Sequence, residues 1–210
     1  MELNLEKISK QIQEQPLNKE DFVKQFIEKT ELLGIKHTFD VEEAWEIGCE
    51  IRKRNAFRKK AKEVQDQLKT HPLYLDEKAS SESNKVKETF SDGLYIREIY
   101  NPENELVVTK IHAKEHVYFL MSGEMSILTH DGIETVKAPY YGITKPGIKR
   151  FIYTHTKCVF ITVHATNKKS WDEIQKDVIA EDFNDPKVAL EDIKLIQKIK
   201  KLLWVQYYLQ

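Results

Sequence analysis

The sequence predicts an α+β fold in which a central antiparallel β-barrel or jelly roll carries helical extensions at both ends. Apolar residues recur at helical spacing before about residue 70 and after about residue 169, but come in short runs between residues 93 and 165. Turn signals, Asp131-Gly132 and Pro146-Gly147, separate several of these runs. No helical pattern interrupts them, so about eight strands follow one another, which is typical of a barrel or a two-sheet jelly roll.

Composition limits the classes of partner. The 210 residues are 40% apolar and 32% charged, with a net charge of −1. This balance supports a core and a well-solvated surface, and it creates no global field toward nucleic acid or an anionic membrane. Short basic runs such as Arg52-Lys53-Arg54 are soon followed by acids, which indicates solvated helix faces. We therefore expect no nucleic-acid partner and no membrane partner.

The cysteines and the apolar runs bear on location. Cys49 and Cys158 are the two cysteines and lie far apart, so we expect no disulfide framework and a reducing compartment. No apolar run approaches the roughly 20 residues of a membrane span. The first ten residues are charged and do not resemble a secretion signal. We expect a protein that is not secreted.

Residues 1–75 are predicted to form a helical region. One helix begins near Asn18, and a second begins with the capping pattern of Asp40 and Glu43. The second helix extends to about Lys69, because His71-Pro72 disfavours the helical conformation. Its second half is polar and offers a partner only three large apolar side chains, Phe57, Val64 and Leu68.

The remaining chain divides into three segments. Residues 76–88, rich in Ser, Lys and Glu, are predicted to form a linker, and residues 89–166 the β-barrel. Residues 167–210 are predicted to form a helical extension, in which Ser170 and Glu173 cap a short helix and Asp185-Pro186 begins another. The apolar end, residues 202–209, would leave an exposed patch if it were free. We expect it to dock on this chain or on a neighbour, as in a homo-oligomer.

Candidate chemistry lies on two strands and their connection. Lys110 and His112 point the same way on a strand because side chains alternate, and His116 follows after a short connection. Neutral imidazole nitrogens are good metal ligands. His164 ends the last predicted strand and, if it points inward, completes a three-histidine metal site with His112 and His116. The alternative is that His112 and His116 are ordinary polar residues at a barrel mouth.

The segment from Lys110 to Glu124 resembles the first motif of the cupin superfamily, Gly-x5-His-x-His-x3-4-Glu-x6-Gly. His112 matches the second histidine and Gly123 the last glycine, whereas His116 stands where the family has its glutamate. Lys110 replaces the first histidine, and Asn104 stands in place of the leading glycine. The resemblance implies a cupin-like jelly roll and one divalent metal as cofactor, of the kinds Fe, Mn, Ni or Zn.

A second stretch resembles the cupin motif Pro-x-Gly-x-x-His in abbreviated form. Pro146-Gly147 supplies the turn, and Arg150 falls near the last metal-binding histidine of the family. Arginine stays protonated and cannot ligate a metal. Cationic Lys110 and Arg150 would instead suit a small anionic ligand such as a carboxylate or phosphate. We take Lys110, Arg150 and Tyr118 as candidate ligand-binding residues and assign no catalytic residue.

Several phrases are also similar to small cupin-like proteins of tailed bacteriophages, among them Asp131-Gly132, Ala138-Pro139 and the stretch from Thr162 to Thr166. This resemblance implies a phage context, in the host cytoplasm or the assembled virion. Together with the polar N-terminal helix, the linker and the apolar C-terminus, it leads us to expect a non-enzymatic structural or interaction module, oligomeric or bound to other virion proteins. Two alternatives stay open. One is a metal-dependent cupin enzyme, an isomerase or dioxygenase acting on a small polar substrate, and the other is a binder of small anionic ligands.

Overall fold

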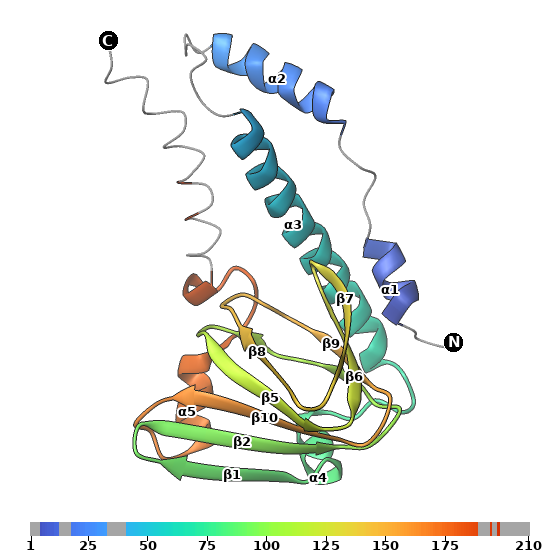
Figure 1. Ribbon diagram of the computed structural model, residues 1–210, viewed down its shortest axis with the longest axis vertical. Coiled ribbons are helices and arrows are strands. Elements are labelled where there is room, and N and C mark those ends of the chain that lie inside the picture. The colour runs from blue at the N-terminus through green and yellow to red at the C-terminus, as the bar shows by residue number, and fades with distance from the viewer. Residues whose placement is uncertain (1–4, 13–17, 33–40, 189–193, 195–196, 198–210) are drawn as a thin grey trace.

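The computed structural model describes residues 5–12, 18–32, 41–188, 194 and 197 (Figure 1). Most of the helix predicted to begin at Asp185-Pro186, and the whole apolar end at residues 202–209, lie outside the described residues. Within them the helices are α1 (Leu5–Ile12), α2 (Lys19–Leu32), α3 (Val41–Lys69), α4 (Glu77–Ser83) and α5 (Trp171–Val178). None of these helices combines the length and apolar character needed to cross a bilayer.

The strands form two main antiparallel sheets. The large sheet has the order β1 (Val86–Ser91), β2 (Leu94–Asn101), β10 (Cys158–Ala165), β5 (His116–Ser122) and β8 (Tyr140–Thr144). The small sheet has the order β3 (Leu106–Val108), β9 (Phe151–Thr154), β6 (Glu124–Thr129) and β7 (Gly132–Lys137). A two-stranded pair joins β4 (Ile111–His112) to β11 (Ile179–Ala180). The predicted hairpin joins β6 to β7, but its two turn residues are His130 and Asp131, and Gly132, at a φ of 115°, begins β7.

The main core lies between the two sheets. Tyr118, Leu120 and Phe160 of the large sheet belong to one buried cluster with Met125 and side chains of the small sheet. The burial of β5 and β10 alternates along each strand, so one face of the large sheet is turned to this core. The predicted α+β fold with a central antiparallel jelly roll and flanking helices is confirmed.

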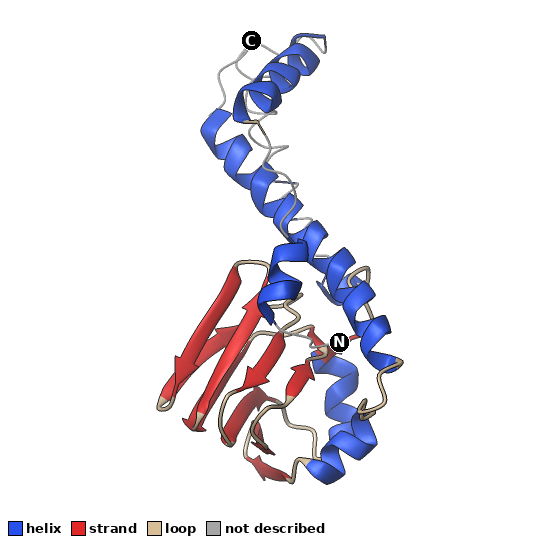
Figure 2. Ribbon diagram, turned by 90° about the vertical axis from the view of Figure 1, so that its right-hand side faces the viewer, coloured by secondary structure: helices blue, strands red, loops and turns tan. Residues whose placement is uncertain are grey.

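Helix α3 covers part of the small sheet. Phe57, Ala61 and Val64 form a second buried cluster with Phe151 of β9 and other apolar side chains, and Leu68 packs against it. The three large apolar side chains predicted for the second half of this helix therefore make its contact with the small sheet. The N-terminal half of α3 extends beyond the strands, and its first residues lie near α2 (Figure 2).

Two segments differ from the prediction. The residues expected to form a linker contain α4 and the start of β1, because Asp76 caps the helix by accepting a hydrogen bond from the Ala79 amide (2.8 Å). The single strand expected from Leu106 to His112 is divided into β3 and β4. At the break, the Thr109 hydroxyl accepts a hydrogen bond from the Arg150 amide (2.9 Å), and β4 turns away to pair with β11.

Candidate metal centre

Three strands bring three histidines together. His112 ends β4, where the backbone amide of Gly147 donates a hydrogen bond to its carbonyl (2.8 Å). His116 begins β5 and points inward, as Tyr118 does two residues later. His164 comes from β10, whose Val163 pairs with Val117 of β5, so His164 lies beside His116. The connection between β4 and β5 and the pairing of β5 with β10 therefore place all three imidazoles in one region.

The rings are in close contact. Ring centroids of His116 lie 4.2 Å from His112 and 4.3 Å from His164, and those of His112 and His164 are 5.8 Å apart. One ring nitrogen from each histidine can be chosen so that all three lie within 4.8 Å of one another. His116 and His164 are buried, with 4% and 3% of their surface exposed.

The most informative feature of the cluster is a set of ring nitrogens without partners. His112 Nδ1, His116 Nε2 and His164 Nδ1 are buried, and none has a hydrogen-bond partner among the described residues. Leaving a buried polar atom unsatisfied costs about 1–3 kcal/mol, so three together call for an explanation. One nitrogen from each ring lies close enough to the others to share a metal ion, which is a partner that such buried nitrogens can take. The donor set therefore fits a metal.

The second nitrogen of His116 indicates which ring atom is available. Nδ1 lies 3.4 Å from the carbonyl oxygen of Lys114, and a hydrogen bond there requires a proton on Nδ1. The lone pair then lies on Nε2, which is the atom without a partner. A backbone carbonyl that orients an imidazole in this way is common around metal ligands.

Burial keeps the three imidazoles neutral. It lowers the pKa of His112 to about 2, of His116 to about 3 and of His164 to about 4. These values already include the charges of neighbouring histidines and of Arg150, which act in the same direction as burial on His112 and His116. At neutral pH all three rings therefore offer lone pairs, the form that binds metal.

Arg150 lies next to this cluster. Its Nη1 donates a hydrogen bond to the Thr144 hydroxyl (2.6 Å), and its Cζ lies 4.6 Å from the ring centroid of Tyr118. Thr144 pairs with His116 across β8 and β5, and Tyr118 is the next inward residue of β5. Of the predicted ligand-binding residues, the structure therefore brings Arg150 and Tyr118 together beside the histidines.

Lys110 takes a different position. Its Nζ lies 3.4 Å from Gln175 Oε1 and 5.9 Å from the ring centroid of Trp171, both on α5. It still contributes to lowering the pKa of His112. The break between β3 and β4 falls at this residue, so the strand alternation that predicted a shared direction with His112 does not extend across it.

Two residues near the histidines were not predicted. Tyr95 is fully buried, 6.1 Å from the His164 ring and 5.7 Å from Trp171 between centroids. Thr144, also fully buried, holds Arg150. The alternation of β2 and β8 could have placed both on inward faces, but only the pairing of strands shows which residues they meet.

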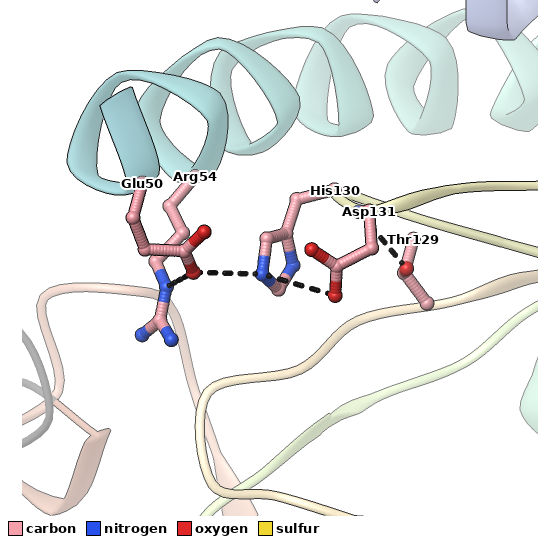
Figure 3. Close-up of polar contacts among 5 residues, drawn as sticks. All are labelled: Glu50, Arg54, Thr129, His130 and Asp131. Atoms are coloured by element: carbon pink, nitrogen blue, oxygen red, sulfur yellow. Dashed lines mark hydrogen bonds and ion pairs between the residues drawn. The ribbon is translucent and has the colours of Figure 1, made fainter. Parts of the chain in front are cut away.

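A second group of possible metal ligands joins α3 to the turn between β6 and β7 (Figure 3). His130 Nε2 lies 3.2 Å from Glu50 Oε1 and 3.6 Å from Asp131 Oδ2, and Arg54 donates to Glu50 at 2.6 Å. Burial opposes ionisation of Glu50, but Arg54 and His130 outweigh it and hold the pKa of Glu50 below its usual value. These atoms already have partners, unlike the ring nitrogens of the three-histidine cluster.

Comparisons with known proteins find solved structures of similar fold and no related sequence. No family model matches the chain, and no curated protein does. Matching structures include a cupin-2 domain containing protein from Shewanella frigidimarina, with 10% identity, a TM-score of 0.34, and coverage of 49% of this chain and 92% of that one. An acetylacetone dioxygenase from Acinetobacter johnsonii has 18% identity, a TM-score of 0.33, and coverage of 44% and 74%.

Hydroxypropylphosphonic acid epoxidase from S. wedmorenis also matches, with 11% identity, a TM-score of 0.31, and coverage of 34% of this chain and 43% of that one. Cupin superfamily structures are thus among the matches, whereas nothing in them bears on the predicted phage relationship. At these scores the likenesses carry no information on activity or ligand.

Proposed function

We propose that His112, His116 and His164 hold one divalent transition-metal ion, and that its remaining coordination positions bind and activate a small polar molecule. The observation that carries this proposal is the set of three buried ring nitrogens without hydrogen-bond partners, one from each histidine. Burying these three nitrogens together is unfavourable in free energy unless a ligand between the rings gives them partners. A metal ion is the simplest occupant for three neutral imidazoles.

The donor set also limits the metal. Imidazole nitrogen suits Zn, Fe, Ni and Cu, whereas Mg and Ca prefer oxygen ligands. Three protein ligands leave at least one position open, as catalytic sites do, whereas structural zinc sites are closed by four. An all-histidine set therefore favours a catalytic or ligand-binding centre with iron, nickel, copper or zinc.

The chain's own residues would have separate roles at such a centre. The histidines, neutral at pH 7, would supply the lone pairs, and the Lys114 carbonyl would orient His116. A bound ion would supply Lewis-acid chemistry toward an oxygen or nitrogen of the ligand. Arg150 and Thr144 would stand beside the open positions and select which ligand enters.

Elemental analysis of the purified protein tests the proposal. We expect close to one equivalent of a transition metal in the wild type, and a loss of at least tenfold in His164→Ala and His116→Ala. His155→Ala is the matched control, because His155 is an exposed histidine whose Nε2 already bonds Ser126 Oγ (2.7 Å). Metal content that stays the same in both cluster variants would refute the proposal.

A second candidate function, self-association, is supported by the outer face of the large sheet. Its outward side chains on β5, β8 and β10 are uncharged, and Met121, Tyr141 and Ile143 are 57%, 69% and 55% exposed. Strand pairing places Phe119 between Tyr141 and Ile161 on this face. An exposed apolar surface of this kind is typical of an interaction site.

We infer that its partner is a second copy of the chain. The part of this face on β10, β5 and β8 carries no charge that would select an oppositely charged partner, so it is compatible with itself, whereas Glu98 of β2 and Lys87 of β1 lie on the part beyond β10. Strand β8 is also the last strand of the large sheet, so two β8 edges can pair antiparallel about a twofold axis and continue the sheet. The predicted role in a virion stays a prediction.

A further inference from the structure

Arg150 carries a buried positive charge that has no negative partner in the described part of the chain. Only 6% of its surface is exposed. Its recorded contacts are the Thr144 hydroxyl and the face of the Tyr118 ring, and no carboxylate among the described residues forms an ion pair with it. Both contacts are neutral, so they do not balance the charge. A buried charge that is not paired is strongly unfavourable.

Other arginines of the chain show the usual arrangement. Arg97 lies 2.9 Å from Glu88, and Arg54 lies 2.6 Å from Glu50. Both are more exposed than Arg150, and both still have a carboxylate partner. Arg150 therefore stands apart as the buried guanidinium for which the described chain provides no anion. Burial also lowers its pKa, which shows the cost of holding the charge there.

The charge is directed at the three-histidine cluster. Thr144, which holds the guanidinium, is the cross-strand partner of His116. Tyr118, whose ring faces the guanidinium, is the next inward residue of β5 after His116. A second cation near a metal would repel it, unless an anion lies between the two. Among the described residues, the arrangement therefore lacks one negative component beside Arg150.

The neighbours of Arg150 keep its guanidinium in place. The Tyr118 ring contacts Arg150 and also packs near Phe160, with 5.3 Å between the two ring centroids. Gly142, opposite Tyr118 on β8, leaves room for the tyrosine ring. A guanidinium held in one orientation loses little entropy when it binds, and its parallel N–H groups match the two oxygens of a carboxylate.

We propose that Arg150 is the anion-binding residue of the histidine centre, and that its ligand is a small molecule bearing a carboxylate or a comparably compact oxyanion. The oxyanion would accept hydrogen bonds from Arg150, and a neighbouring oxygen or nitrogen of the same molecule would face the histidines. This orientation toward a metal rests on the proposed function, whereas anion binding by Arg150 does not. The burial of Arg150 and the histidines restricts the ligand to a small one.

The test compares acetate with acetamide, its neutral isostere, and with inorganic phosphate. Binding is followed by NMR titration at constant ionic strength, in protein freed of metal by a chelator and in protein loaded with zinc. The variants are Arg150→Met and Arg150→Lys. Arg54→Met is the matched control, because it removes a guanidinium that lies beside a carboxylate. Circular dichroism establishes that each variant is folded.

We expect acetate or phosphate to bind metal-free wild type and Arg54→Met equally, at least tenfold more weakly to Arg150→Met, and with intermediate strength to Arg150→Lys. Acetamide should bind none of them measurably. The tighter of the two anions identifies the oxyanion as carboxylate or phosphate. Equal binding of the anions to folded Arg150→Met, or binding of acetamide as tight as acetate, would overturn the inference.

The two proposals fail separately in this experiment. If zinc does not bind but acetate or phosphate still requires Arg150, the metal proposal is wrong and anion binding stands. If zinc binds at the histidines but the anions do not respond to Arg150→Met in either form, the metal proposal stands and this inference is wrong. If both hold, loading with zinc should tighten anion binding in the wild type more than in Arg150→Met.

Discussion

The ring of Tyr118 lies directly on the backbone of Gly142, its partner across β5 and β8. A Cβ added to Gly142 would collide with the phenolic oxygen and come within 2.8 Å of Cε1 of Tyr118. The glycine therefore determines where the tyrosine lies, and the tyrosine in turn contacts the guanidinium of Arg150. This relationship links an edge strand of the large sheet to the candidate site.

Gly142→Ala should displace the Tyr118 ring and destabilise the fold by about 1–3 kcal/mol, because the core has no room for the added methyl group. Urea denaturation at pH 7 measures the change. Gly48→Ala is the matched control, since a Cβ there would meet the Phe22 ring at 3.5 Å, an ordinary contact, within helix α3. That variant should be neutral or stabilised by up to about 1 kcal/mol. A neutral Gly142→Ala would contradict the packing described.

Lys149 makes stability depend on pH. Only 7% of it is exposed, and burial first, then the charge of Lys69, lowers its pKa from 10.5 to about 8. Between these values the unfolded chain holds a proton that the folded chain has released. The free energy of unfolding should therefore rise as the pH increases from 8 to 10.5, by up to about 3 kcal/mol from this residue, and the full penalty remains below pH 8.

Lys149→Met should remove that pH dependence and stabilise the protein at pH 7. Urea denaturation at pH 7, 8, 9 and 10 measures it, as the difference between variant and wild type. The difference should be largest at pH 7 and shrink as the pH rises. Lys145→Met, at an exposed position nearby, is the control. A difference that stays constant with pH would show that the ammonium group does not carry the penalty.

Phe57 anchors α3 to the small sheet. It is 3% exposed, and its ring lies 6.1 Å from Phe151 and 6.4 Å from His130 between centroids. Phe57→Ala should cost about 3–5 kcal/mol through lost burial and the cavity left behind. Thermal and urea denaturation measure the loss, with exposed Lys53→Ala on the same helix as the control. A loss below about 1 kcal/mol would mean that α3 is held on the sheet by other contacts.

The outer face of the large sheet predicts a dimer. Light scattering coupled to size exclusion should give about twice the chain mass of 24.7 kDa for the wild type. The double variant Tyr141→Ser, Ile143→Thr should shift toward the monomer, because it removes apolar area from the face. Ile133→Thr, on β7 of the small sheet and 38% exposed, should leave the mass unchanged. A wild-type monomer at high concentration would exclude this interface.

Much of the fold was predictable from local patterns. The strands from β5 to β8 begin and end within a residue or two of their apolar runs, because alternation and turn residues act over a few positions. The first strand, β1, was missed because its side chains are mostly exposed and show no apolar alternation. Its residues form a strand by pairing with β2, a contact that no local pattern reveals.

The candidate site, too, was partly predictable from local sequence and partly set by the tertiary structure. By itself, the sequence placed His112 and His164 on strands and His116 in the connection before the next strand, because the period of two is a property of the extended backbone, and it named the three as one possible metal site. Only the tertiary structure decided that, within the described residues, a ring nitrogen of each histidine is buried without a partner and Arg150 has no acid beside it, and that Lys110 turns to α5. Strand pairing and the break after β3 set these positions, and both depend on contacts between residues far apart in the chain.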